Sequence, residues 1–368
     1  MNDQITVRQV ASFLESIAPA AYQESYDNTG LLTGDPNMVV TGILTSLDCI
    51  ESIVDEAVAR GANVIVAHHP IIFRGLKRLT GANYVERTVI QAIRKNVAII
   101  AIHTNLDNVF NGVNRRICEK IGLQNIRVLQ PSFNSLVKLV TFVPKDHTNT
   151  LLEALHAAGA GQIGNYKNCS FQLDGTGTFQ PDENARPYLG EQGRQEWVNE
   201  TRVEVILPAH RQRDVMQALR NAHPYEEVAY YLTPLMNENQ EVGAGMIGEL
   251  PEGMEPISFL RSLKERMDLK MVRHTAPAGK EVKKVAVCGG AGSFLLKSAI
   301  SAGADAYVSA DFKYHEFFDA DSRIMIADIG HYESEVFTKE LLKDVLIKKF
   351  PSFAINFSET VTNPISYI

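Results

Sequence analysis

The sequence predicts an α/β protein with mostly parallel sheets, interrupted by a ferredoxin-like α+β domain. Short apolar runs alternate with amphipathic stretches in the first and last thirds of the chain, which favours parallel strands joined by helices on both faces of a sheet. Between them the pattern changes to two β-α-β units, which is typical of the ferredoxin-like fold. We therefore expect an outer domain in two parts, residues 1–129 and 241–368, with an insert at 130–240.

The first part of the chain alternates helix and strand. Five apolar residues recur at helical spacing before Pro19 and predict a first helix: Val7, Val10, Phe13, Leu14 and Ile17. A strand is expected to end near Asp48, followed by a helix over residues 50–60 and a strand that ends at His68. A further helix over residues 84–95 precedes a strand that ends at His103.

The middle part supplies the two β-α-β units. Strands are expected at residues 136–143, around 169–171, at 203–207 and at 227–232, with helices at 148–158 and 213–222. Residues 174–199 are rich in Gly, Pro and polar side chains and are predicted to form a long loop. The motif from His223 to Glu227 is interpreted as a structural turn with a possible interface role.

The last part returns to the pattern of the first. A strand is predicted over residues 282–287, and the glycines at 289, 290 and 292 predict a tight turn into a helix. Those glycines either let backbone amides approach a phosphate or allow close packing of strand and helix, and the sequence leaves both readings open. Two more strands are expected, one after Gly303 and one that ends before Gly330.

Composition limits the class of protein. The 368 residues are 45% hydrophobic and 21% charged, with a formal net charge of −7, which argues against nucleic-acid or membrane-surface binding. The chain starts without the pattern of a signal peptide, and no apolar stretch approaches the roughly 20 residues that span a bilayer. Its four cysteines are scattered, so neither a disulfide framework nor a zinc ribbon is expected, and a cytoplasmic location is the simplest.

Potential metal ligands follow three of the expected strands. The set is His68, His69, Asp107, His331 and Glu335. Because the carboxyl ends of parallel strands meet at one edge of a sheet, we expect these side chains to converge. Pro70 supports an early end of the strand before it, which lets both adjacent histidines reach one site. His331 and Glu335 are four residues apart, on one face of the expected helix.

Three imidazoles and two carboxylates suit zinc, manganese, iron or cobalt. Five side chains exceed what one tetrahedral zinc ion requires, and if Asp107 or Glu335 bridges, the same set can hold two divalent ions. Such a pair activates water and attracts an anionic substrate, with phosphate the first candidate. The sequence therefore indicates a metal-dependent hydrolase acting on a phosphorylated small molecule.

Other polar residues stand near the expected ligands. Asp27 and Asn28 either reach the site or form only a turn. His103 either orients a ligand, together with Thr104, or is itself a sixth ligand. Asp311 and His315 follow another strand end, where they act as proton carriers or simply begin a helix.

Several motifs together resemble the NIF-three-like family, whose members are often named GTP cyclohydrolase I type 2 homologs. They are Tyr26-Asp27-Asn28-Thr29-Gly30-Leu31, His68-His69-Pro70, His103-Thr104-Asn105-Leu106-Asp107, the segment from Ser309 to His315, and that from Asp328 to Glu335. The resemblance covers nearly the whole chain. It implies a dinuclear centre on the five ligands named above and a toroidal homohexamer. It also implies that the insert is a PII-like or CutA-like domain. We expect zinc to be the metal, ahead of manganese, iron or cobalt.

Two functional hypotheses follow. The first is a metal-dependent hydrolase of a nucleotide or other phosphorylated small molecule, similar by resemblance to GTP cyclohydrolase I type 2. The second is a non-catalytic metal-binding protein, such as a metallochaperone or regulatory scaffold, whose insert senses a ligand.

Overall fold

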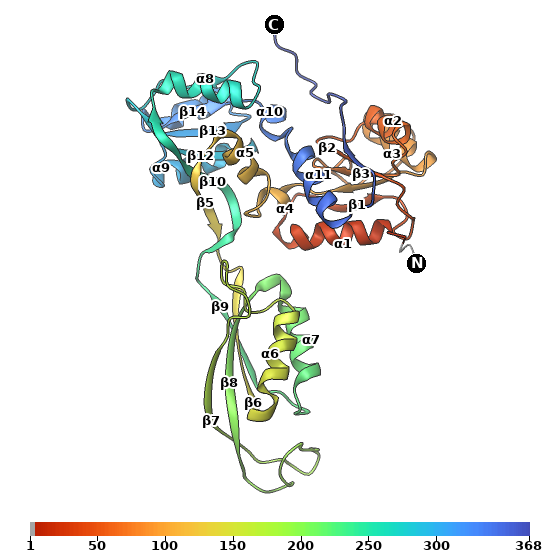
Figure 1. Ribbon diagram of the computed structural model, residues 1–368, viewed down its shortest axis with the longest axis vertical. Coiled ribbons are helices and arrows are strands. Elements are labelled where there is room, and N and C mark those ends of the chain that lie inside the picture. The colour runs from red at the N-terminus through yellow and green to blue at the C-terminus, as the bar shows by residue number, and fades with distance from the viewer. Residues whose placement is uncertain (1–3) are drawn as a thin grey trace. The chain divides into compact units, whose positions relative to one another are not determined.

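The computed structural model describes residues 4–368, which form two compact units. The first unit contains residues up to Gln130 and from Val242 onwards, and the second contains Pro131–Glu241. Each unit carries its own sheets and helices (Figure 1). The result is a mixed α/β protein with several sheets.

The first sheet has the strand order β1-β4-β3-β2-β15. Its strands are β1 (Gly30–Thr33), β2 (Ile43–Ser46), β3 (Val64–Ala67), β4 (Ala98–Ala101) and β15 (Ile355–Phe357). Pairing is parallel from β4 to β15, and only β1 joins antiparallel. The parallel strands are short and apolar throughout, as expected for strands buried on both faces.

Helices cover both faces of this sheet. The helices are α1 (Val7–Ile17), α2 (Glu51–Ala59), α3 (Tyr84–Arg94) and α11 (Thr338–Lys349). Side chains of α1 and α11 share a core with Val64 and Val66, whereas those of α2 and α3 pack with Ile65 and Ala67. This alternation follows from the two-residue period of a strand. The helices predicted over residues 7–17, 50–60 and 84–95 are confirmed.

The second sheet has the order β11-β14-β13-β12-β10-β5. Its strands are β5 (Gln124–Ser132), β10 (Asn239–Met254), β11 (Arg273–His274), β12 (Val282–Ala291), β13 (Ala306–Ala310) and β14 (Met325–Asp328). β12, β13 and β14 are parallel, but β10 and β11 pair antiparallel. This sheet is therefore mixed where mostly parallel pairing was predicted, because β10 and β11, which are joined through α8 (Pro256–Arg266), run opposite to β12, β13 and β14.

Four helices and two 3₁₀ turns of the described chain accompany this sheet and the ligand-bearing loops. They are α4 (Thr104–Asp107), α5 (Val113–Ile121), α8 (Pro256–Arg266), α9 (Leu296–Ser301), η4 (Ser293–Leu295) and η5 (Tyr314–Ala320). Apolar side chains of α5 and α8 belong to the same buried cluster as those of α1. One continuous core therefore joins the two sheets of the first unit.

The second unit contains one antiparallel sheet, ordered β7-β8-β6-β9. Its elements are β6 (Leu136–Pro144), α6 (Thr148–Ala157), β7 (Phe171–Phe179), β8 (Glu196–Pro208), α7 (Gln212–Ala222) and β9 (Tyr230–Leu235). This β-α-β-β-α-β order is that of the ferredoxin-like fold. Leu151, Leu155, Val215 and Leu219 of the two helices are buried against the sheet.

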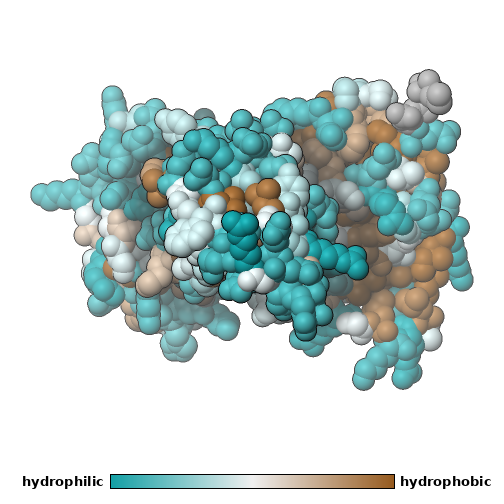
Figure 2. Space-filling view, turned by 90° about the horizontal axis from the view of Figure 1, so that it is seen from below, coloured by the Kyte–Doolittle hydropathy of each residue, from teal (hydrophilic) through white to brown (hydrophobic). Residues whose placement is uncertain are grey.

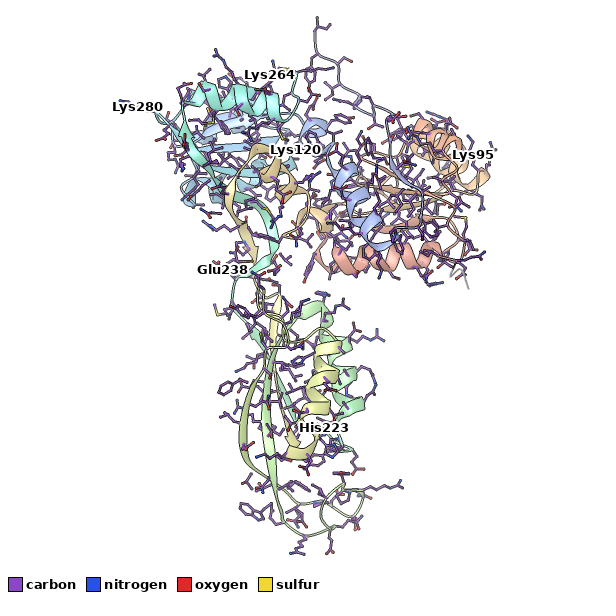
Figure 3. All side chains as sticks on the ribbon, viewed as in Figure 1. Lys95, Lys120, His223, Glu238, Lys264 and Lys280 are labelled. Atoms are coloured by element: carbon purple, nitrogen blue, oxygen red, sulfur yellow. The ribbon has the colours of Figure 1, made fainter. Side chains whose placement is uncertain are left out.

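Two predictions about the second unit have different outcomes. The long loop predicted at residues 174–199 is wrong at both ends, because β7 continues to Phe179 and pairs there with Glu196 of β8. Gly and Asp lower the strand signal of this segment, and pairing with β8 overrides it. The structural turn at His223, labelled in Figure 3, is confirmed: Nε2 donates to the Phe142 carbonyl and Nδ1 accepts from the Tyr225 amide.

No helix within residues 4–368 is long and apolar enough to cross a bilayer. The face shown in Figure 2 is mostly hydrophilic, and its hydrophobic residues lie in separate patches.

Candidate metal centre

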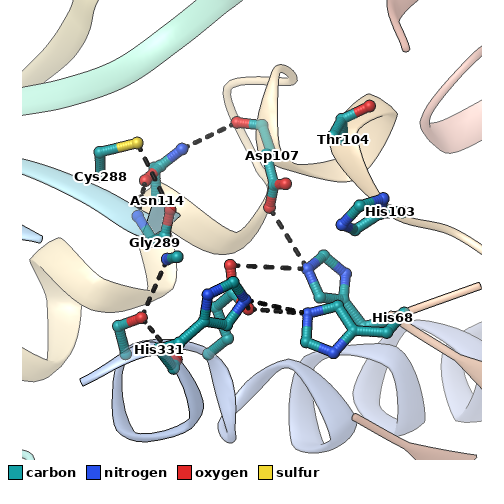
Figure 4. Close-up of polar contacts among 12 residues, drawn as sticks. His68, His103, Thr104, Asp107, Asn114, Cys288, Gly289 and His331 are labelled. Atoms are coloured by element: carbon teal, nitrogen blue, oxygen red, sulfur yellow. Dashed lines mark hydrogen bonds and ion pairs between the residues drawn. The ribbon is translucent and has the colours of Figure 1, made fainter. Parts of the chain in front are cut away.

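The five predicted ligands come together in the first unit (Figure 4). His68 and His69 follow β3 directly, and Asp107 closes the short helix α4 that follows β4. α10 (His331–Glu335) begins three residues after β14 and carries the remaining two ligands. Strand ends of two different sheets therefore supply the site, and their common core holds them together.

His68 presents an unprotonated nitrogen to two carboxylates. Its ring is fully buried, and Nδ1 donates to the Ile102 carbonyl at 2.9 Å. Nε2 then carries the lone pair, yet it lies 3.6 Å from Asp107 Oδ1 and 3.9 Å from Glu335 Oε1. Within residues 4–368, His68 Nε2 and Asp107 Oδ1 have no hydrogen-bond partner. A buried imidazole nitrogen and a buried carboxylate oxygen that face one another without hydrogen-bond partners form an arrangement that a cation satisfies.

His69 and His331 share the second oxygen of Glu335. Their Nε2 atoms lie 3.0 and 3.1 Å from Glu335 Oε2, and 3.4 Å from each other. Each ring is held from behind by another carboxylate: His69 Nδ1 is 2.7 Å from Asp48, and His331 Nδ1 is 2.7 Å from Asp311. A carboxylate behind an imidazole fixes its orientation and makes it a better metal ligand.

The charges of these groups depend on one another. Burial alone would lower the pKa of His69, but its bonds to Asp48 and Glu335 raise it to about 10. Burial is likewise outweighed at His331, where Glu335 and Asp311 raise the pKa to about 9. Burial lowers the pKa of His68 to about 3, so this ring is neutral at physiological pH. Burial also raises the pKa of Asp107, whereas the two histidines hold that of Glu335 low despite burial.

His103, like His69 and His331, has a carboxylate behind its ring. Its Nδ1 lies 2.8 Å from Asp27, and Asp27 also accepts from the amide and hydroxyl of Thr104. Burial acts to raise the pKa of Asp27, but these bonds lower it to about 2. Of the two readings left open for the Asp27 region, the structure therefore supports the one in which Asp27 reaches the site.

Three groups of side chains in the described residues can hold a metal ion. They are His69-His331-Glu335, His68-Asp107-Glu335, and His68-His69-His103. Within each group the potential ligand atoms lie within 4.8 Å of one another. The first two groups share Glu335, and the third includes His103, so both readings of His103 remain compatible with the geometry.

The two predicted proton carriers lie in different surroundings. Asp311 contacts His331 and has a positive φ of 58° directly after β13. His315 is exposed on η5, with its ring 5.2 Å from that of Tyr314 and 6.4 Å from that of Phe318.

The glycines after residue 288 make room for the ligands. Gly289 and Gly290 lie in β12 at a register irregularity, whereas Gly292 follows β12 and caps the 3₁₀ turn η4, which leads into α9. The predicted turn into a helix is therefore confirmed at Gly292, but it begins later than expected. A Cβ at Gly290, where φ is +60°, would lie 2.5 Å from Glu335 Oε1. The amides of Gly289 and Gly290 donate to Asn114 and Ser334. Of the two readings of these glycines, the structure supports close packing.

Asp48 was given no role in the sequence analysis, although it supports His69. It follows β2 as His69 follows the neighbouring β3, so the argument from strand ends applies to it equally. Thr362 was also missed; its hydroxyl donates to Asp48 Oδ2. No sequence pattern marks Thr362, because it lies in an irregular segment after β15.

A cavity of about 170 Å³ opens beside the cluster. Its lining includes the ligands Asp107, His331 and Glu335, together with His103. Two aromatic side chains, Tyr26 and Phe294, also line it. The candidate ligands are therefore accessible to a small molecule.

Comparisons with known proteins identify the family. The family model for Duf34/NIF3 (NGG1p interacting factor 3) matches residues 5–364. The chain belongs to the Duf34/NIF3 family. It is 39% identical over 364 residues to a Halalkalibacterium halodurans protein named GTP cyclohydrolase 1 type 2 homolog, covering 98% of each chain. A Bacillus subtilis protein of the same name is 36% identical over 378 residues, covering 100% of each chain.

The Duf34/NIF3 fold is also found in solved structures. A crystal structure of a Bacillus cereus protein related to NIF3 has a TM-score of 0.87 and 38% identity, with each chain covered completely. The family resemblance stated from the motifs is therefore confirmed over nearly the whole chain.

Proposed function

We propose that the chain is a metal-dependent hydrolase whose candidate centre holds two divalent ions and acts on a nucleotide or other phosphorylated small molecule. The observation that carries the proposal is the buried contact of His68 Nε2 with Asp107 and Glu335. One ion would be held by His68, Asp107 and Glu335. The second would be held by His69, His331 and Glu335, with Glu335 shared.

The donor set favours a borderline divalent ion. Imidazole nitrogens and carboxylate oxygens suit zinc first, with manganese, iron and cobalt as alternatives. Two such ions supply Lewis acidity, lower the pKa of a water molecule and stabilise charge on a phosphoryl group.

The protein's own side chains prepare this chemistry. Asp48 and Asp311 orient His69 and His331, and the Ile102 carbonyl fixes the tautomer of His68. The carboxylate of Asp311 contacts His331 Nδ1, so we assign Asp311 an orienting role in addition to the proposed proton transfer. His315 stays a prediction as proton carrier. His103 borders the cavity and is either a sixth ligand or an orienting group.

The names of the relatives support a nucleotide substrate. Two of them are named GTP cyclohydrolase 1 type 2 homolog. Opening of a purine ring at C8 and cleavage of a phosphate ester both require attack by an activated water. The proposal therefore covers both reactions and leaves GTP as one substrate to be tested.

Metal content is the first measurement. Purified protein, with no metal added, is expected to contain about two divalent ions per chain by elemental analysis. The loaded protein is then assayed with GTP, GMP and p-nitrophenyl phosphate, beside His331→Ala. Hydrolysis that the variant loses while it stays folded supports the proposal. Full metal occupancy without turnover would favour the metal-binding scaffold instead.

We also propose a toroidal homohexamer and a PII-like role for the insert. Both rest on the family resemblance, and the ferredoxin-like topology of residues 131–241 supports the second. Sedimentation equilibrium tests the first, with a mass of six chains of 40.8 kDa expected.

A further inference from the structure

We propose that Tyr26 and Phe294 form a subsite that stacks a planar ring of the substrate while its phosphate group faces the metal centre. The inference rests on the proposed function and specifies its substrate class. It assigns a role to two side chains that bind no metal.

Both aromatic side chains line the cavity that contains the metal ligands. Tyr26 precedes β1 of the first sheet, and Phe294 lies on η4 after β12 of the second sheet. The cavity lining therefore includes one aromatic side chain that precedes a strand of the first sheet and one that follows a strand of the second sheet.

These rings are unusually exposed for large apolar groups at a cavity. Tyr26 is 62% exposed and Phe294 is 65% exposed. Covering such surface with an apolar ring removes it from water and is favourable. Base–aromatic stacking is tolerant of base identity, so the subsite would select a ring rather than a particular base.

The ring of Tyr26 contacts a neighbouring aromatic ring. The ring of Phe73 lies 6.1 Å from Tyr26 and 6.2 Å from the ring of His103. His103 is itself fixed by Asp27, the residue after Tyr26. Tyr26 is therefore linked through Phe73 and His103 to the candidate metal centre, and it lines the same cavity as three of the candidate ligands.

The charge around the cavity favours a single phosphate group. Two divalent ions would carry four positive charges, and six carboxylates surround them: Asp27, Asp48, Asp107, Asp311, Glu335 and the cavity-lining Glu24. Each additional phosphate brings further repulsion from these groups. We therefore specify the ligand as a ring-bearing monophosphate.

Binding to the metal-loaded full-length protein tests the subsite. The probes are GMP, which has a ring, and ribose 5-phosphate, which has the sugar and phosphate alone. GMP is expected to bind more tightly than ribose 5-phosphate and more tightly than GTP. Phe294→Ala and Tyr26→Ala should each weaken GMP binding roughly 5- to 100-fold and leave ribose 5-phosphate unchanged.

Two further variants serve as controls. Tyr26→Phe should retain GMP affinity, since stacking needs only the ring. Phe318→Ala removes a side chain that is 67% exposed and lies outside the cavity lining, and should affect neither probe.

Four results would overturn the inference. Equal affinities for GMP and ribose 5-phosphate would exclude ring stacking. So would an equal loss of affinity for both probes in Phe294→Ala. Tighter binding of GTP than of GMP would exclude a monophosphate as the preferred ligand. It would indicate that the exposed Arg74, which follows Phe73 in the sequence, contacts the additional phosphates. If the loaded protein bound neither GMP nor ribose 5-phosphate, the proposed phosphate chemistry itself would fail.

Discussion

The carboxylate of Asp48 lies 2.7 Å from Nδ1 of His69, and so links the end of β2 to a candidate ligand at the end of β3. The other oxygen of Asp48 accepts from Thr362, which comes after β15 on the far side of β2. His69 is thus oriented by a chain of contacts that crosses three neighbouring strand ends.

Removing Asp48 should weaken metal binding without removing a ligand. Asp48→Ala leaves His69 Nδ1 without its acceptor, and loss of such a partner typically costs 10- to 100-fold in metal affinity. Titration of metal-free protein against a competing chelator measures this. Thr362→Val should give a smaller loss in the same direction. Asp55→Asn, on the exposed face of α2, is the matched control, and an unchanged affinity in Asp48→Ala would contradict the orienting role.

Glu335 should be needed for both ions, because two of the ligand groups share it. We expect Glu335→Gln to reduce the metal content well below that of His331→Ala, which retains the His68-Asp107-Glu335 group. Elemental analysis of the two purified variants makes the comparison. Two ions per chain in Glu335→Gln would rule out the shared carboxylate.

Metal binding should release protons at neutral pH. In the metal-free protein the pKa values of His69 and His331 are raised to about 10 and about 9, so both rings are protonated at pH 7.5. A metal displaces those protons, so the two histidines together release about two per chain, and affinity should rise with pH up to about 10. Any proton on Asp107, whose pKa burial raises, adds to that number. Calorimetric titration in buffers of different ionisation enthalpy counts the protons. A pH-independent affinity between pH 6.5 and 9 would be inconsistent with this assignment.

Glu56 should stabilise the fold except at extreme acid. Burial acts to raise its pKa, but hydrogen bonds from Ser358 and Thr360 lower it to about 2. Because the folded pKa lies below the unfolded one, this stability is complete above about pH 4.5 and disappears as the pH falls through about 2.

Glu56→Gln should therefore lower the unfolding free energy by roughly 1–3 kcal/mol at pH 7 and have little effect near pH 2. Denaturant unfolding at both pH values measures the difference. Glu359→Gln, at an exposed carboxylate, is the control. An equal deficit at both pH values would show that the Glu56 charge is not responsible.

Local patterns explain most of the fold that was predicted. The helix at Val7–Ile17 and the buried strands before His68 and His103 follow from hydrophobic periodicity, which acts over a few residues. The two ends of the loop predicted at 174–199 were wrong because Gly and Asp weaken a local strand signal. The pairing of residues 174–179 with residues 196–201 is a contact that only the folded sheet provides.

By itself, the sequence determined the family, the α/β class and the positions of the candidate ligand residues along the chain. Strand ends and helical spacing can be recognised from the order of the residues alone. Only the tertiary structure decided which atoms meet. It paired Asp48 with His69 and Asp27 with His103, and brought Phe294 to the cavity of Tyr26. The two contacts join residues 21 and 76 positions apart, and the cavity brings together residues 268 positions apart. These placements depend on how the two sheets pack on a common core, which no local pattern encodes.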